Sequence, residues 1–553
     1  TDLVIESDES VASAIEARVA VPEGAPKPDT ISREVAALYA DEEFHPLWIR
    51  AGKATVRATE LMQVLRNASD KGLQPMDYVG PWVAVDVTGK VPHDERSAVD
   101  VAITTAAVRL VSDLRFGRAN PGVYDSATTK GSQPELAALV RQSVLEPASL
   151  DEGLAALDPP DPGFGRLLEG LKTYRELATK EVPEDTDFLP AAPNGKPVEP
   201  GTTYSGAKQL AQVLALVGDL SAEDQARVEQ SEAPAYDGAL LTAAKKFQER
   251  HGLEPDGRLG RATLAELRQP ISDRVQKIEL TLERMRWMPR TEMRSVVVNV
   301  PEFRLRAGSK PGDAELSANV VVGLDGKVSS TNTPLFTAKM TYVTFHPYWN
   351  VPTSIQRKEL VPAITKDRDY LAKHDYEVID GKGNIITAEA VTDDVLAQLR
   401  VGRLTIRQRP GPQNALGAVA FMFPNAFDVY IHDTPSKSFF ARAQRALSHG
   451  CIRVEKPADF AAWVLSGQED GDKEWDAKTI SEEVSQGKEL RKVPLTHPIQ
   501  VFIVYQTAAV QENGEIRFFT DMYGYDAKLA KQLAERNSPD KITSAAPGPR
   551  PRV

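Results

Sequence analysis

The spacing of apolar residues changes along the chain from a helical period to a strand period. Between Ile31 and about Lys180, apolar residues recur at the spacing of amphipathic helices, most clearly in 98–114 and 167–177. From Ser295 onward, short apolar runs alternate with Gly, Pro and Asp, which is typical of strands joined by turns. The pattern therefore predicts a multi-domain α+β protein with a helical N-terminal half and a β-rich domain after residue 290.

Breaks in this pattern divide the chain further. A Pro- and Gly-rich stretch predicts a linker, and the Asp256-Gly257 turn lies inside a compact three-helix unit. Many short strands with turn residues between them favour a sandwich-like or partly closed β-structure. In order, we expect a flexible lead-in, a helical domain, a linker, the three-helix unit, a connecting helix, the β-rich domain, and a C-terminal helix with a Pro-rich tail: 1–30, 31–188, 189–203, 204–269, 270–290, 291–525 and 526–553.

One further segment interrupts the predicted strands. Residues 354–402 have helical spacing, clearest in 355–360 and 392–399, and Thr392 is a plausible N-cap for the second of these helices. Such an insertion can be merely decorative, or it can cover a groove and exclude water from it.

Length and charge narrow the class of protein. A chain of 553 residues is too long for one core. The net charge of −12 argues against a nucleic-acid partner, because nothing forms a basic stripe. The sequence contains no run of about 18 apolar residues, which a membrane-spanning helix would need. Because the chain begins at Thr1 without a signal peptide, we expect a mature or trimmed form whose export signal or anchor has been removed.

The candidate chemistry centres on a single cysteine. Cys451 lies in Ser-His-Gly-Cys-Ile-Arg, and His432 precedes it by nineteen positions (451 − 432). A thiol becomes a strong nucleophile when a neighbouring imidazole or dipole favours its thiolate. A lone thiol in an oxidising compartment is a liability unless it reacts. We interpret Cys451 as a nucleophile and His432 as its base, with an inert buried cysteine as the alternative.

These motifs resemble those of a known family. An upstream His followed by Ser-His-Gly-Cys-x-Arg is similar to the L,D-transpeptidases, the YkuD-like enzymes that remodel peptidoglycan. Phe-His-Pro-Tyr-Trp-Asn-Val-Pro at 345–352, Arg-Pro-Gly-Pro-Gln-Asn at 409–414 and Phe-Pro-Asn at 423–425 extend the likeness to the large Gram-negative members, the YcbB type. The segment 247–264 resembles a small helical peptidoglycan-binding module.

The resemblance implies a domain plan. According to this resemblance, the helical region is a scaffold domain, and the three-helix unit at 204–269 is a peptidoglycan-binding module. The β-rich domain at 291–525 is the L,D-transpeptidase catalytic domain, and the insertion at 354–402 is its helical lid. Whether the module binds peptidoglycan or serves only as scaffolding stays open. The resemblance also implies a periplasmic location.

The resemblance further implies acyl transfer through a thioester. Cys451 would attack the stem tetrapeptide at its L-centre carbonyl and expel D-alanine, and a diaminopimelate amine would then resolve the thioester into a 3→3 crosslink. An outer-membrane protein amine or water are the other acceptors that stay open. Acylation by carbapenem-type inhibitors is implied, and no cofactor or metal is expected. A zinc site at Cys451, His432 and His449, or a non-catalytic wall-binding scaffold, are the competing interpretations.

The remaining site residues have predicted roles. The amides of Gly450 and Cys451 are natural oxyanion donors, while His449 could donate, shape the site or be structural. Either a backbone carbonyl or the carboxylate of Asp433 would orient His432. We expect substrate contacts or loop support from six further residues: Arg453, Ser448, Tyr348, Trp349, Asn414 and Tyr430.

Overall fold

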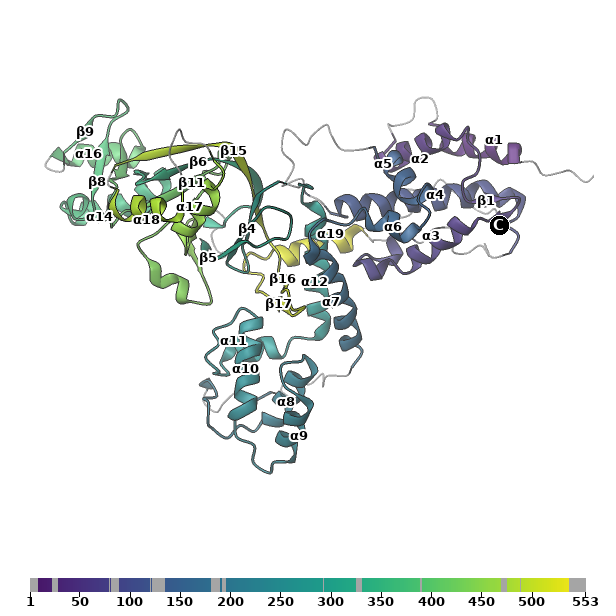
Figure 1. Cartoon of the computed structure of the whole chain (residues 1–553), viewed down its shortest axis with the longest axis horizontal. Helices are drawn as coiled ribbons and strands as arrows, with labels where there is room; N and C mark the ends of the chain where they lie inside the picture. Colours follow the sequence, from purple (N-terminus) through teal and green to yellow (C-terminus); the bar gives the residue numbers. More distant parts are fainter. Residues whose placement is uncertain are drawn as a thin grey trace, which may run out of the picture. The chain divides into compact units, whose positions relative to one another are not determined.

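The computed structural model describes residues 8–21, 28–78, 80, 89–119, 121, 135–180, 189–190, 195–291, 293–324, 331–387, 390–468, 475–487 and 489–536. The chain forms two compact units (Figure 1). The first comprises Thr1–His251, Pro255–Arg290 and Gln506–Val553, and the second comprises Gly252–Glu254 and Thr291–Tyr505. The fold is multi-domain α+β, with helical regions in the first unit and a β-barrel in the second, which confirms the predicted class. Within the described ranges, no helix has the length and apolarity needed to cross a membrane.

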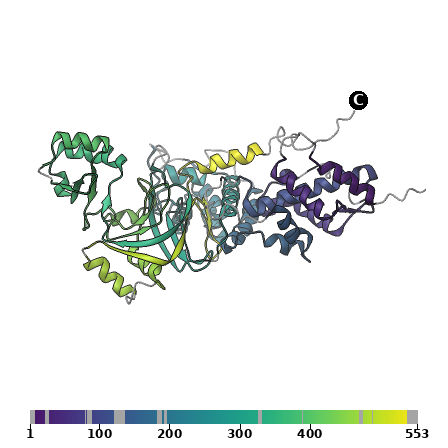
Figure 2. The ribbon, with the colours of Figure 1, turned by 90° about the horizontal axis from the view of Figure 1, so that it is seen from above.

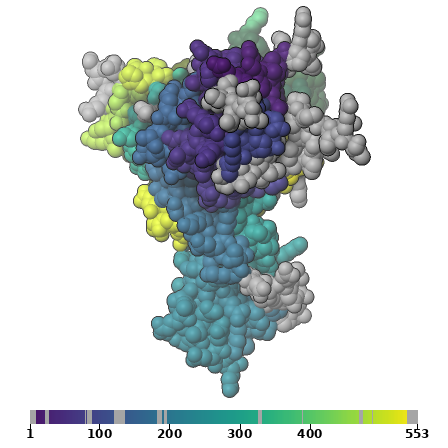
Figure 3. All heavy atoms as spheres, turned by 90° about the vertical axis from the view of Figure 1, so that its right-hand side faces the viewer, coloured from purple at the N-terminus to yellow at the C-terminus, as the bar shows by residue number. Residues whose placement is uncertain are grey.

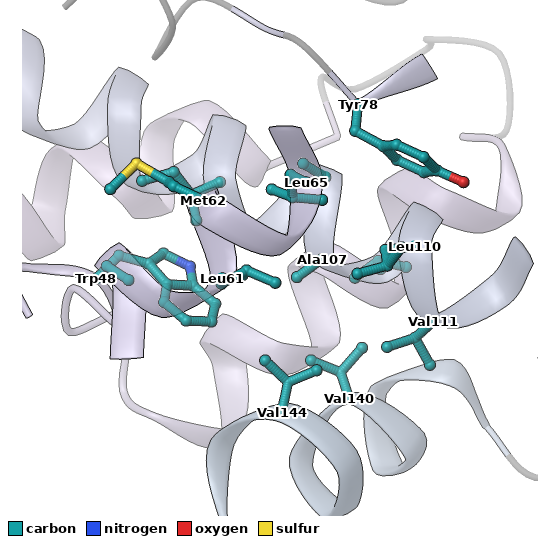
Figure 4. Packing of buried hydrophobic residues seen from close by; sticks show 14 of the residues in the cluster. Trp48, Leu61, Met62, Leu65, Tyr78, Ala107, Leu110, Val111, Val140 and Val144 are labelled. Carbon is teal, nitrogen blue, oxygen red and sulfur yellow. The ribbon is translucent and has the colours of Figure 1, made fainter. Parts of the chain in front are cut away.

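Helices build the N-terminal region, whose purple to blue atoms face the viewer in Figure 3. The side chains of Trp48, Leu61 and Val111 are fully buried and pack together in its core (Figure 4). Asp100 accepts hydrogen bonds from the backbone amides of residues 47–49 and from the Tyr39 hydroxyl, so it fixes the loop that carries Trp48. The helices are α1 (Asp8–Val19), α2 (Thr30–Asp41), α3 (Val56–Arg66), α4 (His93–Phe116), α5 (Leu136–Val140), α6 (Leu150–Ala155) and α7 (Pro162–Ala178).

The prediction of a flexible lead-in over 1–30 is wrong for its central part. Residues 8–19 form α1, and Val11 and Ile15 are buried in the same core as α4. These two residues are four positions apart and therefore lie on one face of a helix, where they can bury apolar surface together. The rest of the lead-in at 1–7 and 22–27 lies outside the described residues.

Within its described residues, the central helical region has four helices, whereas the sequence predicts three. It contains α8 (Ala207–Leu216), α9 (Ala222–Gln230), α10 (Gly238–Arg250) and α11 (Arg261–Leu267), and α12 (Ile271–Trp287) follows as the connecting helix. The extra helix is α9, which buries no residue and therefore lacks the apolar stripe that identifies a helix in sequence.

The boundary expected at residue 525 is also wrong. The strands β16 (Ala508–Val510) and β17 (Ile516–Phe518) form a separate hairpin, which with α19 (Tyr525–Arg536) belongs to the first unit. The reason is burial, because Ala508, Ile516 and Phe518 share one hydrophobic core with α7 and α12. Arg284 of α12 and Asp526 of α19 lie 2.5 Å apart as an ion pair within this unit. The predicted Pro-rich tail, 537–553, lies outside the described residues.

A closed barrel replaces the sandwich-like arrangement expected for the second unit (Figure 2). In its described residues a nine-stranded sheet runs β13-β5-β14-β12-β11-β6-β15-β3-β4, and β5 also pairs with β4. This last pairing joins the two sides of the sheet and closes it, which removes exposed strand edges. The strands are β3 (Ser295–Asn299), β4 (Arg304–Gly308), β5 (Leu316–Gly323), β6 (Phe336–Phe345), β11 (Val419–Met422), β12 (Ile431–His432), β13 (Ala446–Ser448), β14 (Ile452–Val454) and β15 (Arg491–Val504).

Two helices accompany the barrel, α17 (Pro457–Leu465) and α18 (Ala477–Gln486). Phe460 of α17 packs on Phe421 of β11, with ring centroids 4.4 Å apart. Pro457 at the start of α17 and Gly467 after its end follow the usual asymmetry of helix termini. This packing supports the strand that precedes the candidate site.

The insertion contains strands as well as helices, so the expectation of a purely helical segment is wrong. The strands β7 (Trp349–Asn350), β10 (Thr405–Gln408), β8 (Tyr376–Ile379) and β9 (Ile385–Ile386) form a four-stranded antiparallel sheet in that order among its described residues. These strands have only two to four residues, too few for a period-two pattern to be recognised. The helical parts are α13 (Thr353–Ile355), the π-helix η7 (Gln356–Leu360), α14 (Val361–Lys366), α15 (Tyr370–Lys373) and α16 (Asp393–Val401).

The insertion has a hydrophobic core of its own, in which Ile364, Leu399 and Ile406 are fully buried. Gln356 is buried at its centre, where its amide donates to the carbonyls of Leu399 and Leu404 and accepts from Ile406 N–H. These bonds hold η7 at a fixed position on the sheet of the insertion.

Candidate active site

The pairing of two short parallel strands brings four of the predicted residues to one face of the barrel. His432 of β12 lies opposite Arg453 of β14. Two positions earlier on each strand, Tyr430 lies beside Cys451, and the carbonyl of Tyr430 accepts from Ile452 N–H at 3.0 Å. Alternate residues of a strand point to the same face, so all four side chains project together.

His432 has one ring nitrogen committed to the backbone. It is 4% exposed, and its Nδ1 lies 2.5 Å from the carbonyl oxygen of Asp433. Since a carbonyl only accepts hydrogen bonds, Nδ1 carries the proton in the neutral ring and Nε2 keeps its lone pair. Burial, with a smaller effect from the positive charge of Arg453, lowers the pKa of His432 to about 3. The resting imidazole is therefore neutral.

The hydrogen bonds of the Asp433 carboxylate go to groups other than His432. Its oxygens accept from Ala418 N–H at 2.9 Å and Thr434 N–H at 2.6 Å, and it pairs with Lys437. Of the two orienting partners considered for His432, the backbone carbonyl is therefore the one in place, and the side chain of Asp433 braces the loop around it.

The thiol of Cys451 is half-buried, and its Sγ lies 3.7 Å from the carbonyl oxygen of Asp428. Burial raises the pKa of the Cys451 thiol, while the hydrogen bond to Tyr430 and the charge of Arg453 oppose this effect. Burial raises the pKa of the Tyr430 phenol as well. Thiol and imidazole therefore rest in their neutral forms.

The loop that carries the thiol is pinned by hydroxyl groups. Ser448 Oγ donates to the carbonyl of Cys451 at 2.6 Å and accepts from Gly450 N–H at 3.1 Å. Thr333 Oγ1 donates to the carbonyl of Gly450 at 2.8 Å. Gly450 has a φ of 120°, a conformation that side chains rarely permit. The amide of Gly450 is thus occupied by Ser448, which corrects its expected role as a free oxyanion donor.

Arg453 and His449 flank the thiol loop with different partners. The Arg453 guanidinium lies 5.9 Å from the Phe439 ring, and its buried Nε has no hydrogen-bond partner among the described residues. The imidazole of His449 is 45% exposed, and its Nε2 lies 2.7 Å from Glu359 Oε1 in the π-helix η7. The insertion therefore contacts the loop next to the nucleophile.

Among the predicted groove residues, two keep some exposure and one does not. Arg407 lies over the Tyr348 ring at 4.4 Å, and the Trp349 ring lies 6.3 Å from that of Tyr376. Asn414 is fully buried, and its amide donates to the carbonyls of Pro347 at 3.0 Å and Arg409 at 2.9 Å. The expectation that Asn414 contacts substrate is wrong for this structure, because all its polar atoms hold the loop.

Comparison with known families identifies the domain that holds this site. Residues 293–479 match the model of the L,D-transpeptidase catalytic domain (YkuD). The chain carries an L,D-transpeptidase catalytic domain. Residues 33–171 match a model described as "Scaffold domain" and 209–267 one described as "Putative peptidoglycan binding domain". These matches confirm the predicted family and its combination with the two helical regions.

A protein of Haemophilus influenzae described as "Putative L,D-transpeptidase" is 33% identical over 266 residues. The match covers 48% of this chain and 51% of that relative, so the chain spans about half the length of the curated relative it matches.

Several residues around the candidate site were not predicted from the sequence. Thr333 donates to the carbonyl of Gly450 in the thiol loop, and Lys437 pairs with the Asp433 carboxylate. Gly417 leaves room for the Asp433 carboxyl group. Glu359 approaches His449 from the insertion. Thr333, Gly417 and Glu359 lie far along the chain from their partners, so no local spacing could have indicated them. Lys437 is four positions from Asp433, a spacing that is common between surface charges and so does not single it out. Among the described residues, no group of three His, Cys, Asp or Glu side chains lies together as a metal site.

Proposed function

We propose that this protein is a peptidoglycan L,D-transpeptidase in which Cys451 forms a thioester with a stem tetrapeptide. The observation that carries the proposal is the pairing of β12 with β14, which aligns Cys451 and His432 on one face. The hydrogen bond from His432 Nδ1 to the Asp433 carbonyl adds to it, since it leaves Nε2 as a base.

In the donor half-reaction, His432 Nε2 accepts the thiol proton as Sγ attacks the carbonyl of the L-centre residue. The C–N bond to the terminal D-alanine breaks, and the same proton passes to the leaving amine. Because thiol and imidazole both rest neutral, the proton transfer accompanies the attack and does not precede it. The oxyanion needs amide donors, and Cys451 N–H, which donates to no other group among the described residues, is available for it.

Arg453 is suited to binding a carboxylate of the donor. Its guanidinium lies on the same face as Cys451, and its buried Nε has no partner among the described residues. A buried guanidinium N–H without an acceptor costs free energy, which a substrate carboxylate would offset. Ser448 would act on the backbone of the loop and not on the substrate.

In the acceptor half-reaction, the side-chain amine of a diaminopimelate residue attacks the thioester and produces a 3→3 crosslink. A protein amine would instead anchor that protein to the wall, and water would make the enzyme an L,D-carboxypeptidase. The match at 209–267 supports contact with peptidoglycan through the helical region. Such a substrate lies outside the cytoplasm, so a periplasmic location follows from the proposal.

A product assay tests this function. Full-length protein is incubated with disaccharide tetrapeptides, and products are separated and identified by mass. We expect release of D-alanine and formation of 3→3 dimers, both lost in Cys451→Ser. Tripeptide monomers without dimers would assign water as the acceptor. No release of D-alanine by folded wild-type protein would refute the proposed function.

A further inference from the structure

The site contains a second imidazole whose partner belongs to the insertion. His449 Nε2 and Glu359 Oε1 are 2.7 Å apart, and the two side chains are 45% and 51% exposed. A carboxylate accepts hydrogen bonds, so Nε2 carries a proton and Nδ1 keeps the lone pair in the neutral ring. Nδ1 has no hydrogen-bond partner among the described residues. His449 is therefore open at one nitrogen, as His432 is.

The two imidazoles differ in their surroundings. His432 is buried against a neutral carbonyl oxygen and faces the cationic Arg453. His449 is half-exposed, and its Nε2 faces the carboxylate of Glu359. The field of Glu359 also reaches Tyr376, where it adds to burial and to Tyr370 in raising the pKa to about 12. Of the two rings, His449 is the one that lies beside both solvent and a carboxylate.

The position of Glu359 is fixed by the fold of the insertion. It lies in η7, a π-helix, and such turns occur frequently at functional sites. Gln356 at the start of this turn is 1% exposed and bonded at three points within the insertion. The sheet of the insertion also includes β7, where the Trp349 ring lies 6.3 Å from that of Tyr376. Glu359 is thus presented to the loop of Cys451 by a rigid element.

We propose that Glu359 and His449 form the subsite that receives and deprotonates the cationic amine of the acyl acceptor. The inference rests on the proposed function, in which an amine resolves the thioester. The amine arrives as an ammonium ion, because its pKa is about 10.4 like that of lysine. Glu359 attracts the cation, and His449 Nδ1 takes one proton from it before the attack.

The remaining steps balance the bonds and protons. The amine lone pair forms the C–N bond, the C–S bond of the thioester breaks, and the second amine proton passes through His432 to the Cys451 sulfur. The imidazolium of His449 then releases its proton to solvent. When water is the acceptor no ammonium is deprotonated, so loss of Glu359 acts on transfer and spares hydrolysis.

The partition of the thioester between amine and water tests this subsite. A tetrapeptide stem serves as donor and an isotope-labelled diaminopimelate tripeptide as acceptor, and mass spectrometry gives the ratio of labelled dimer to unlabelled tripeptide. This ratio does not depend on how fast the thioester forms. At neutral pH we expect Glu359→Gln to lower it about tenfold, the equivalent of one pKa unit, and His449→Gln about 10²-fold.

A matched control removes a different carboxylate from the insertion. Asp393 is an exposed residue paired with Arg368, and Asp393→Asn should leave the ratio at the wild-type value. Near pH 10, close to the amine pKa of about 10.4, a large share of the acceptor amine is already neutral without help from the protein. The deficit of Glu359→Gln should therefore shrink there, which a purely structural defect would not do. An unchanged ratio in Glu359→Gln, or a deficit that persists at pH 10, would overturn the subsite. Absence of any D-alanine release by wild type would instead overturn the proposed function.

Discussion

Substitution of Gly417 by alanine should damage the site through Asp433. Gly417 has a φ of +60°, and an added Cβ would lie 2.6 Å from Asp433 Cβ and overlap the carboxyl group. That carboxyl group cannot move freely, because it accepts from Ala418 and Thr434 and pairs with Lys437. The left-handed backbone costs alanine about 1 kcal/mol and the overlap about 1–3 kcal/mol more, so we expect about 2–4 kcal/mol of destabilisation.

The same substitution should slow the chemistry. The carbonyl of Asp433 orients His432, and displacement of a catalytic group by about 1 Å can cost about 10²-fold in rate. The assay combines calorimetric melting with the rate of carbapenem adduct formation measured by intact mass. We expect a lower melting temperature and acylation slowed about 10²-fold in Gly417→Ala.

Gly383→Ala is the matched control, because Gly383 has a φ of +86° but no atom within 4 Å of its added Cβ. It should lose only about 1 kcal/mol and acylate like wild type. If Gly417→Ala behaved like Gly383→Ala in both measurements, the overlap with Asp433 would have no effect and the reasoning would be refuted.

Three further predictions follow from the loop and the two titrating groups. Ser448→Ala should lose about 1–3 kcal/mol and slow carbapenem acylation, because two hydrogen bonds that pin the thiol loop disappear; unchanged rate and melting would contradict this. The pKa of His432 is about 3 in the folded state and about 6.5 when unfolded, so its contribution to stability is complete above pH 6.5 and declines as pH falls toward 3, at about 1.4 kcal/mol per pKa unit. Urea denaturation across pH should therefore show a weaker acid decline in His432→Asn than in wild type, and equal declines would contradict the assignment. Because burial raises the pKa of the Cys451 thiol, the ultraviolet difference spectrum of wild type minus Cys451→Ser should show no thiolate absorbance at pH 7, and a full thiolate signal there would indicate an ion pair instead.

The sequence allowed the reactive pair to be predicted because its chemistry is local. Cys451 lies in a short motif, and His432 precedes it by the length of one loop. The role of Asn414 was not predictable in the same way. An asparagine in a polar loop looks available to a ligand, yet its partners are backbone carbonyls, one of them 67 positions away at Pro347. Only the folded chain reveals that its amide is already used.

In the fold too, features set by neighbouring residues could be predicted, whereas features set by residues far apart in the sequence could not. The helical and strand-rich halves followed from apolar spacing, whereas barrel closure depends on β5 pairing with both β4 and β14, which no spacing encodes. The acidic and Pro-rich composition of 1–30 predicts a flexible segment, yet Val11 and Ile15 are buried. Burial against a distant helix decided its structure.

The central claim is that Cys451 is the acylated nucleophile and His432 its base. Intact mass of the full-length protein after incubation with a carbapenem tests it most directly, with peptide mapping of the adduct. The account predicts one adduct on Cys451 in wild type, none in Cys451→Ser, and slower acylation in folded His432→Ala. An adduct on another residue, or acylation of His432→Ala at the wild-type rate, would contradict it.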